Sequence, residues 1–595
     1  MNAKEKHQIL DYVNKYTDVF NDMMGEVTKR MIKHDAVPDL ASMLQKGIDE
    51  QDFGQYIKID PKKFIQQQYE FLQKQKQLWE NASQVFMGAD FAPVIAAEPG
   101  DKRFKDEDWE DNPAFKYIKQ AYLLNAEYLN QMVESMEFEN KQIENQVHFY
   151  TRQFINSVAP TNYLLTNPEV CREILETKGQ NLAKGIDNFR RDLERSPQEA
   201  FKVTQVASDA FALGKELAKT PGEVVFKNEL IELIQYKAET EQVRKIPLLI
   251  VPPFINKFYI LDLDEKKSMV RWLVSQGYTV FMVSWVNPDE SYRHIPFDDY
   301  INKGVIAAIE AASEISSSKN VNAVGYCVGG TVLAMAAAYM KQVGDERVNS
   351  LTLLTTLLDF SEPGEVGTYL TNYMVPMLEQ SVISKGYLDG RILAMGFSLL
   401  RENNLFWSFF IENYLKGKDP MPFDILYWNS DSTNLPADAY LYYLKNMYLE
   451  NNLVQPGKIE VNGTPIDVQA IQLPTYCLAA QADHIVIWGA AHKSAKYLGD
   501  DVRFVLTESG HVAGVINPAD KTKYSHWVND NASTDANDWF AGAAQKGGSW
   551  WLDWHEWLSE RSGSQVKARK VGKLKKYPAL GDAPGEYVLR RLDDI

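Results

Sequence analysis

Residues 325–330 read Gly-Tyr-Cys-Val-Gly-Gly, and this stretch carries the clearest structural signal in the chain. The apolar residues Val321, Ala323 and Val324 precede it, and small residues with helical character follow it at 332–340. A strand, a sharp turn and a helix, with a nucleophile between two glycines, form the context of a nucleophile elbow. The glycines permit the tight turn because they have no Cβ that could collide with neighbouring backbone. The pattern predicts that Cys327 lies at the N-terminus of a helix, where a reactive thiolate is stabilised.

Activation of a thiol requires a base and an acid, and α/β-hydrolases supply them in the chain order nucleophile, acid, histidine. A buried strand predicted at 474–480 opens into Asp483. The next predicted strand, at 502–507, opens into a glycine-flanked loop that contains His511. Cys327, Asp483 and His511 therefore follow strands in the expected order. His484 is the alternative base, but the loop after the last core strand favours His511.

Other candidates occupy weaker positions. Three further acidic residues lie near His511 in the sequence: Asp501, Glu508 and Asp520. None of them follows a strand as Asp483 does. We interpret Cys171 and Cys477 as small core residues, in a helix and in a strand respectively.

An acyl-transfer site also needs two hydrogen-bond donors for the developing oxyanion. One is the backbone N–H of Val328, the residue after the nucleophile. We expect the second donor in the loop after the early strand predicted at 246–251, close to Phe254, Ile255 and Asn256.

Several blocks of sequence outside these residues extend the pattern. They are the stretches 251–263, 325–331, 482–485, 509–514 and 547–551 and, in the N-terminal half, 151–154, 160–162, 166–168 and 179–181. Together they resemble the class I polyhydroxyalkanoate synthases, a family of the α/β-hydrolase superfamily, from about Arg103 to the C-terminus. By position, the resemblance implies that Cys327 is the acylated nucleophile, His511 the general base and Asp483 the third catalytic residue. Phe254 stands where some relatives carry Cys, a difference that concerns the pocket wall.

The resemblance implies an acyltransferase that polymerises (R)-3-hydroxyacyl-CoA thioesters, mainly 3-hydroxybutyryl-CoA, into polyester and releases CoA. Its implied partners are this substrate, the growing polyester, a granule surface and a second copy of the chain in a cytoplasmic homodimer. No cofactor is expected, because CoA is part of the substrate, and no metal, because clustered Cys and His spacings are absent from the sequence. Two alternatives are a Cys-dependent hydrolase, such as a thioesterase or a dienelactone-hydrolase-like enzyme, and a non-catalytic scaffold. The Cys, Asp and His argue against the scaffold.

Composition narrows the class of protein. A net charge of −17 argues against binding nucleic acid over an extended surface. Three cysteines provide no disulfide framework, which suits a reducing compartment, and the N-terminal residues lack an apolar signal segment. The uncharged run 323–340 contains the elbow, so a buried strand and helix account for it better than a membrane span. A basic cluster at 567–576 is either a solvated tail or a docking patch for granules or CoA phosphates.

The domain organisation follows from the periodicity. Residues 1–205 are helix-patterned and predict an α-helical N-terminal domain. Residues 206–595 alternate strands and helices, which predicts an α/β-hydrolase domain with a mostly parallel sheet. An aromatic-rich insertion at about 360–465 is expected to be a lid. Its aromatic residues form either the core of the lid or an apolar passage that excludes water.

Overall fold

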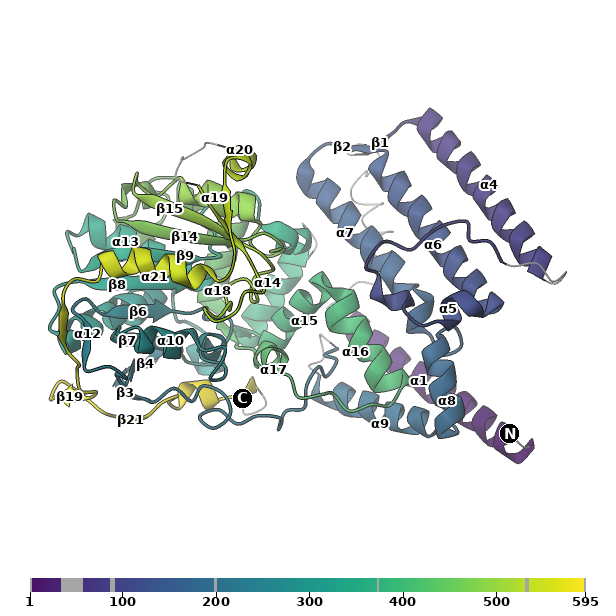
Figure 1. Ribbon diagram of the computed structural model, residues 1–595, viewed down its shortest axis with the longest axis horizontal. Coiled ribbons are helices and arrows are strands. Elements are labelled where there is room, and N and C mark those ends of the chain that lie inside the picture. Colours follow the sequence, from purple (N-terminus) through teal and green to yellow (C-terminus); the bar gives the residue numbers. More distant parts are fainter. Residues whose placement is uncertain are drawn as a thin grey trace. The chain divides into compact units, whose positions relative to one another are not determined.

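The computed structural model describes residues 3–33, 57–85, 91–196, 201–371, 374–529 and 535–592 (Figure 1). The chain divides into two compact units. One comprises Met1–Ala207 with Met395–Met421, and the other comprises Ser208–Ala394 with Pro422–Ile595. The segment 395–421 lies inside the interval expected for the lid, yet it packs with the N-terminal helices, so the first unit is discontinuous in sequence.

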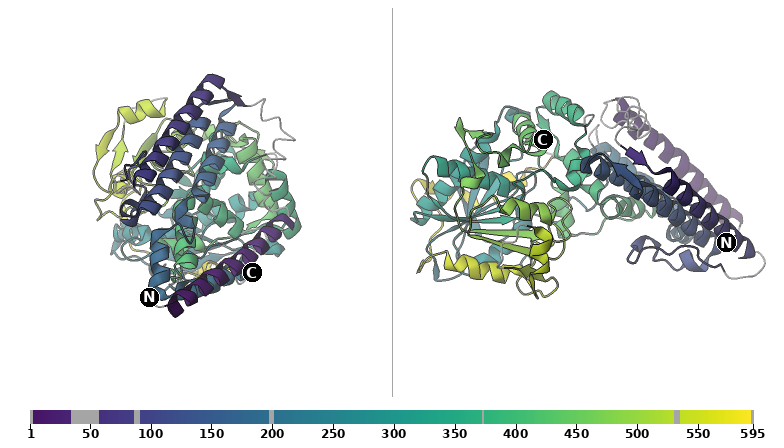
Figure 2. Two further views of the ribbon diagram at one scale, coloured as in Figure 1. Left: turned by 90° about the vertical axis from the view of Figure 1, so that its right-hand side faces the viewer. Right: turned by 90° about the horizontal axis from the view of Figure 1, so that it is seen from above.

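The first unit is α-helical, as predicted. Its described helices include α1 (Ala3–Lys33), α4 (Pro61–Val85), α5 (Asp108–Asp111), α6 (Pro113–Glu134), α7 (Lys141–Ser157), α8 (Pro168–Thr177) and α9 (Gln180–Arg195). Asn112 and Asn167 cap α6 and α8 through their side-chain oxygens, and each precedes a proline at the first helical position. Such Asn-Pro pairs start helices because the cap satisfies an orphan N–H while proline has none to satisfy. The long helices α4 and α6 pack against each other (Figure 2).

The segment 395–421 completes an aromatic core in this unit. It contains η7 (Asn403–Trp407), α16 (Ser408–Phe410) and η8 (Ile411–Leu415). Phe410 and Tyr414 pack with Phe189 of α9, and the Tyr414 hydroxyl donates a hydrogen bond to Asp192. These aromatic side chains therefore form a core of the helical unit.

The second unit is built on an eleven-stranded sheet. From one edge to the other the strand order is β17 (Ala544–Lys546), β16 (His526–Val528), β15 (Val502–Thr507), β14 (Thr475–Ala480), β9 (Val348–Leu354), β8 (Val321–Tyr326), β6 (Leu248–Val251), β7 (Val280–Trp285), β4 (Ile231–Tyr236), β3 (Gly222–Lys227) and β21 (Gly581–Asp582). Neighbours from β15 to β7 are parallel, and the pairs toward both edges are antiparallel. The parallel strands β6, β7, β8 and β14 are buried along their whole length, as expected for a sheet covered on both faces. The predicted mostly parallel sheet is confirmed.

Helices and the remaining lid surround this sheet. The elbow strand β8 leads into α13 (Val328–Gln342), and α21 (Trp550–Glu560) lies along one face of the sheet (Figures 1 and 2). The part of the insertion that belongs to this unit contains α14 (Met374–Lys385), α17 (Asp424–Ser430), α18 (Ala437–Tyr443) and η9 (Leu444–Leu449). It lies in the sequence between β9 and β14, which are parallel neighbours in the sheet, and so it begins at the C-terminal end of β9, at the same edge of the sheet as the elbow.

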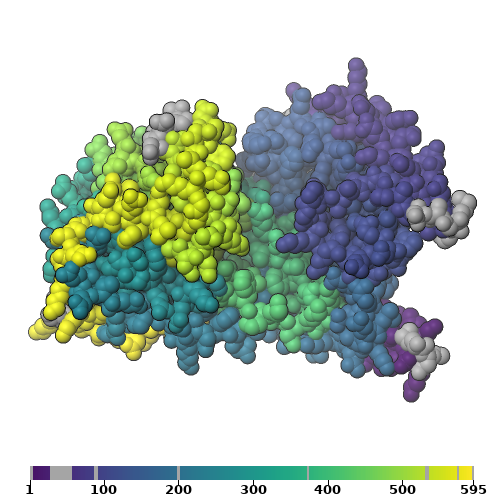
Figure 3. All heavy atoms as spheres, viewed as in Figure 1, coloured from purple at the N-terminus to yellow at the C-terminus, as the bar shows by residue number. Residues whose placement is uncertain are grey.

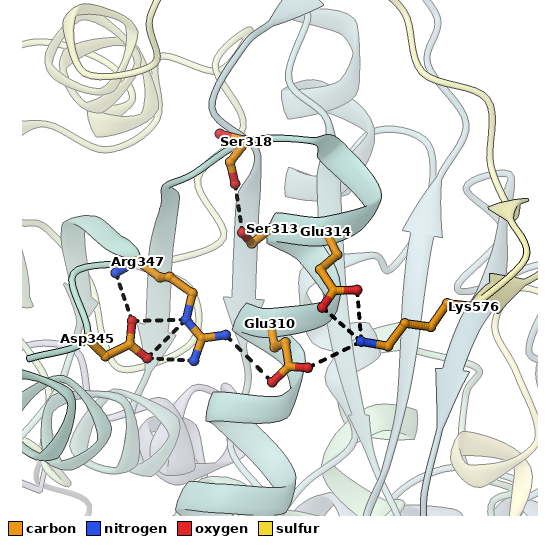
Figure 4. Close-up of polar contacts among 7 residues, drawn as sticks. All are labelled: Glu310, Ser313, Glu314, Ser318, Asp345, Arg347 and Lys576. Atoms are coloured by element: carbon orange, nitrogen blue, oxygen red, sulfur yellow. Dashed lines mark hydrogen bonds and ion pairs between the residues drawn. The ribbon is translucent and has the colours of Figure 1, made fainter. Parts of the chain in front are cut away.

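The C-terminal segment returns along the second unit after α21 (Figure 3). Its strand β18 (Gln565–Lys567) pairs with β5 (Gln242–Arg244), and β21 joins the sheet beside β3. Lys576 forms ion pairs with Glu310 and Glu314 of α12 (Ala307–Ser316), so at least one lysine of the basic cluster contacts the protein itself (Figure 4). Within the described ranges, every helix is too short or too polar to cross a lipid bilayer.

Candidate active site

Cys327 occupies a strained turn between β8 and α13. Its φ of 52° and ψ of −127° lie in a region that side-chain-bearing residues rarely adopt. A Cβ on Gly325 would lie 2.3 Å from the Gly330 Cα, and a Cβ on Gly329 would lie 2.4 Å from the Val251 carbonyl oxygen. The two glycines of the elbow are therefore required by close backbone contacts, while the strain is concentrated at the cysteine.

Backbone hydrogen bonds hold the turn in place. The Cys327 N–H donates to the Leu354 carbonyl of β9 at 2.9 Å, and its carbonyl accepts from the Gly330 N–H at 2.9 Å. Val328 is the first residue of α13, where an N–H has no acceptor within the helix. This N–H and the positive end of the helix dipole are available to a negative charge beside the sulfur.

His511 and Asp483 form a short hydrogen bond. The His511 Nδ1 lies 2.6 Å from Asp483 Oδ2, and both side chains are buried. The other carboxylate oxygen of Asp483 accepts from the N–H groups of Ile485 and Val486, each at 2.9 Å. The carboxylate is thus fixed on both sides, and it orients the imidazole with Nδ1 toward the acid.

The electrostatics favour a protonated imidazole. Burial alone would lower the pKa of His511, but the negative charges of Asp483 and Cys327, together with hydrogen bonds to both, raise this pKa well above its usual value. His511 can therefore hold the proton of Cys327 as one half of an ion pair. Such an arrangement generates the thiolate, which is the nucleophilic form of cysteine.

Three residues that the sequence did not mark for this role hold the His511 loop. The Tyr326 hydroxyl donates to the His511 carbonyl at 3.1 Å. The indole N–H groups of Trp550 and Trp551 donate to the carbonyls of Gly514 and Val515, each at 2.9 Å. The signal for these contacts is the tryptophan pair in the block 547–551, but only the fold shows which loop it meets.

The alternative acids and the alternative base make other contacts. Asp501 pairs with Arg561, Glu508 accepts from the Ser525 N–H, and Asp520 pairs with Lys521. The His484 carbonyl accepts from the Glu365 N–H. The structure thus brings His511, and none of these groups, to the side chain of Asp483 among the contacts described.

The two other cysteines lie away from any elbow. Cys477 is buried inside β14, where burial raises the pKa of its thiol to about 12. Cys171 is half-buried in α8, and burial also raises its pKa. Burial therefore disfavours the reactive thiolate at both positions.

The loop after β6 lies against the first turn of α13. The contact of Val251 with Gly329 brings the loop there, and the Trp285 indole N–H donates to the Pro252 carbonyl at 2.9 Å. Asn256 pairs with Ser432 through an isolated β-bridge. Ile255, half-buried, packs at the edge of the hydrophobic core. The predicted donors, the backbone of Val328 and that of 254–256, therefore lie on two adjoining segments.

Aromatic side chains gather beside Cys327. Phe254 is buried in ring contacts with Trp285, Phe297, Tyr300 and Tyr443. Tyr443 and Tyr448, from the lid, contact each other and Phe360. Burial raises the pKa of both phenols, and the charge on Cys327 raises it further, so both side chains are neutral. The lid aromatic residues thus divide between two roles: residues near 410 form a core of the helical unit, and residues near 445 pack against Phe254 and Phe360 of the second unit.

Across the ranges that the structure describes, no group of three or more His, Cys, Asp or Glu side chains is arranged to hold a metal ion.

Comparison with known proteins identifies relatives of this chain. Residues 100–273 match the family described as "Poly-beta-hydroxybutyrate polymerase (PhaC) N-terminus", and residues 246–518 match the "alpha/beta hydrolase fold" family. A Methylorubrum extorquens protein named "Poly(3-hydroxyalkanoate) polymerase" is 41% identical over 89% of this chain and 87% of its own length. The "Poly(3-hydroxyalkanoate) polymerase subunit PhaC" of Cupriavidus necator is 43% identical over 82% of this chain and 83% of its own. Among solved structures, the α/β hydrolase GrgF of Penicillium sp. sh18 covers 49% of this chain and 91% of its own, at 15% identity and a TM-score of 0.32.

Proposed function

Because the chain belongs to the poly(3-hydroxyalkanoate) polymerase family, we propose that it elongates a polyester on Cys327, using 3-hydroxyacyl-CoA as the monomer and releasing CoA. The enzyme is an acyltransferase of the α/β-hydrolase superfamily that makes polyhydroxyalkanoate. The observation that carries the proposed mechanism is a thiol on a strained elbow, in contact with an imidazole that Asp483 holds at 2.6 Å.

The first step is acylation of the thiol. His511 takes the Cys327 proton, and the sulfur attacks the thioester carbonyl of the substrate. The oxyanion accepts hydrogen bonds from the Val328 N–H and from an N–H of the 254–256 loop. When the tetrahedral intermediate collapses, the carbon–sulfur bond to CoA breaks and His511 returns its proton to the leaving thiolate. One thioester is exchanged for another, so the step is nearly thermoneutral.

The second step is elongation. His511 removes the proton from the 3-hydroxyl of the next 3-hydroxyacyl-CoA, and that oxygen attacks the carbonyl bound to Cys327. The new ester bond replaces the thioester, and the Cys327 thiolate leaves and recovers the proton. The extended chain, now a CoA thioester, acylates Cys327 again and releases CoA. Asp483 either orients His511 throughout or acts more directly on the incoming hydroxyl.

The aromatic side chains near Cys327 favour polymerisation over hydrolysis. Phe360, Tyr443 and Tyr448 supply apolar surface beside the sulfur. An acyl-enzyme that meets water is hydrolysed, whereas one shielded by aromatic side chains survives until the next hydroxyl arrives.

The substrate range and cellular setting belong to the same proposal. We expect a preference for short 3-hydroxyacyl groups, C4 to about C6, because Phe254 and Phe258 are bulky and fully packed near the expected site. The growing polymer makes a granule surface the natural location of the enzyme, in the cytoplasm. A preference for 3-hydroxydecanoyl-CoA over 3-hydroxybutyryl-CoA in competition assays would contradict the size limit.

A single assay tests the function. The enzyme is supplied with 3-hydroxybutyryl-CoA, and free thiol and insoluble polyester are both measured. Polymer with CoA release supports the proposal, thiol without polymer indicates a Cys-dependent hydrolase, and neither product indicates a non-catalytic scaffold.

The role of Cys327 is tested by substitution. Cys327→Ala should abolish CoA release with the fold intact, whereas Cys477→Ala and Cys171→Ala should still release CoA. Intact-mass detection of the acyl group on either of those two cysteines would refute the assignment.

A further inference from the structure

Lys257 is a buried lysine directly beside the proposed oxyanion loop. The residue follows Asn256 in the sequence and is 3% exposed. The ammonium donates hydrogen bonds to the carbonyls of Val588 at 3.0 Å and Arg590 at 2.6 Å, with a longer contact to Tyr587 at 3.5 Å. These acceptors belong to the turn η12 (Tyr587–Leu589) in the C-terminal segment and to the residue after it. A residue beside the proposed oxyanion loop is thus tied to a turn more than 300 positions away in the sequence.

The opposite end of this turn is held by a carboxylate. Glu232 of β4 is 1% exposed and accepts from the N–H groups of Glu586 and Tyr587, each at 2.9 Å. A negative group therefore meets the N–H end of the turn, and the Lys257 ammonium meets its carbonyl end. Both charges have the sign that stabilises the end of the turn they contact.

Two further contacts restrain the backbone at Asn256 and Lys257. The Trp428 indole N–H donates to the Lys257 carbonyl at 2.7 Å, and Asn256 pairs with Ser432. With the side chain anchored in η12 as well, rotation of the peptides between Phe254 and Lys257 is restrained from several sides. An oxyanion donor is effective only when its N–H is already aimed at the developing charge.

We propose that Lys257 is a positioning residue for the oxyanion: its ammonium, bound by the carbonyls around η12, holds the 254–256 backbone with an N–H directed at the reacting carbonyl. The inference rests on the proposed function, because that function assigns the second oxyanion donor to this loop. In this proposal the C-terminal segment takes part in acyl transfer through the buried, charge-assisted hydrogen bonds between the Lys257 ammonium and the carbonyls of Val588 and Arg590. The exposed ion pairs of Lys576 with Glu310 and Glu314 attach the same segment weakly by comparison (Figure 4).

The test separates acylation from thiol reactivity. Lys257→Met keeps the length of the side chain and removes the donors, whereas Lys257→Arg restores donors. The matched control is Lys576→Met: Lys576 pairs with Glu310 and Glu314 and so attaches the same C-terminal segment at a site away from the loop and from η12. Each variant is measured for the CoA burst with 3-hydroxybutyryl-CoA, for KM, and for alkylation of Cys327 by iodoacetamide across pH.

Alkylation forms no oxyanion, so the two readouts should diverge. We expect Lys257→Met to lower the acylation rate constant about 10- to 100-fold at saturating substrate, while the rate and pH profile of alkylation stay within about twofold of wild type. Lys257→Arg should recover part of the acylation rate, and Lys576→Met should acylate like wild type. A chain ending at Gly585 lacks the acceptor carbonyls; it should show the same loss, and adding Lys257→Met should cost nothing further.

Several outcomes would overturn the inference. They are a wild-type burst in Lys257→Met, equal losses of acylation and alkylation, an equal defect in Lys576→Met, or additive losses with the shortened chain. If the wild-type enzyme itself shows no burst that depends on Cys327, the proposed function fails instead, and the two failures are distinct.

Discussion

At the scale of single residues, Asp483 and His511 share one hydrogen bond but differ in their relation to the sulfur. His511 contacts both Asp483 and Cys327, whereas Asp483 is hydrogen-bonded to His511 and to backbone N–H groups. Substitution of His511 and substitution of Asp483 should therefore impair different steps of the reaction.

His511→Ala should block the first acylation, because no other group is positioned to take the thiol proton among the contacts described. Asp483→Asn should still acylate Cys327, yet elongate about 10²- to 10⁴-fold more slowly if Asp483 assists the incoming hydroxyl. Rapid-quench measurement compares the CoA burst with steady-state release. Equal loss of burst and steady state in Asp483→Asn would show that Asp483 only orients His511.

The raised pKa of His511 also predicts a pH dependence of stability. A group whose pKa is higher in the folded state stabilises the fold fully below its unfolded pKa, about 6.5, and loses this contribution as pH rises through the folded pKa. In a Cys327→Ala background, where the thiol cannot titrate, adding Asp483→Asn should destabilise the protein most near pH 6. The difference in the free energy of unfolding should shrink as pH rises above about 6.5 and through the folded pKa of His511. Urea unfolding across this range checks it, and a difference that grows with pH would contradict the assignment of the raised pKa to Asp483.

The sequence analysis predicted that Cys327, Asp483 and His511 each follow a strand, and the C-terminal ends of the strands of a parallel sheet meet at one edge. It did not reveal that Tyr326, Trp550 and Trp551 hold the His511 loop. Those contacts join positions up to 185 residues apart, and no local pattern encodes the partner of an indole N–H.

At the scale of elements, one buried carboxylate joins the lid to the sheet. Asp359 follows β9, and its oxygens accept from the side chains of Asn451, Lys493 and Tyr497. The Asn451 side chain in turn accepts from the Phe360 N–H at 2.8 Å. The end of the tyrosine-bearing lid helix is thereby fixed beside Phe360, which contacts Tyr448.

Asp359→Asn should lower the free energy of unfolding by about 2 kcal/mol at pH 7. Burial would raise the pKa of Asp359, but hydrogen bonds from Ser361, Lys493 and Asn451 lower it to about 2. A lowered carboxyl pKa stabilises the fold above the unfolded value, near 4, and this contribution disappears as pH falls toward 2. About half of the difference should be gone by pH 3.

The control for this prediction is Glu310→Gln, in the exposed network with Arg347 and Lys576 (Figure 4). A surface change of this kind should stay within about 0.5 kcal/mol at every pH. Equal effects of Asp359→Asn and Glu310→Gln at pH 7 would show that the buried anchor contributes no more than a surface ion pair.

The long apolar strands were predictable from the sequence, since a short continuous run of β-branched and apolar residues between turn signals is typical of a strand buried on both faces. The edge strands β16, β17 and β21 were not predicted. Each has only two or three residues, and β17 and β21 are exposed throughout, so they lack the alternation or hydrophobicity that marks a strand. Their place in the sheet depends on pairing with strands already formed.

At the scale of the whole molecule, the sequence predicted two folded parts, and we expected the aromatic insertion at about 360–465 to form one lid. The structure divides it, because Phe410 and Tyr414 pack on α9 while Tyr443 and Tyr448 pack beside the elbow. Composition cannot distinguish these groups, since both are rich in aromatic residues. Which helices they meet is decided by long-range packing.

The assembly of the enzyme is the remaining expectation at this scale. The family resemblance implies a homodimer, and the lid supplies exposed apolar side chains in the second unit: Ile383, Phe423 and Leu449 are 57%, 47% and 45% exposed. Apolar groups of this kind on a lid are candidates for an interface, because exposed hydrophobic patches often bury against a partner. Ile383→Lys should then weaken the dimer, whereas Leu580→Lys, at a similarly exposed position of the C-terminal segment, should not.

Specific activity should rise with enzyme concentration at high dilution, in step with the appearance of a dimer by light scattering. Ile383→Lys should shift both curves to higher concentration by about tenfold or more if the side chain is buried on assembly, since about 1.4 kcal/mol corresponds to a factor of ten. Leu580→Lys should leave both curves in place. Constant specific activity with a monomer at every concentration would contradict the homodimer, and a dimer unaffected by Ile383→Lys would place its interface elsewhere.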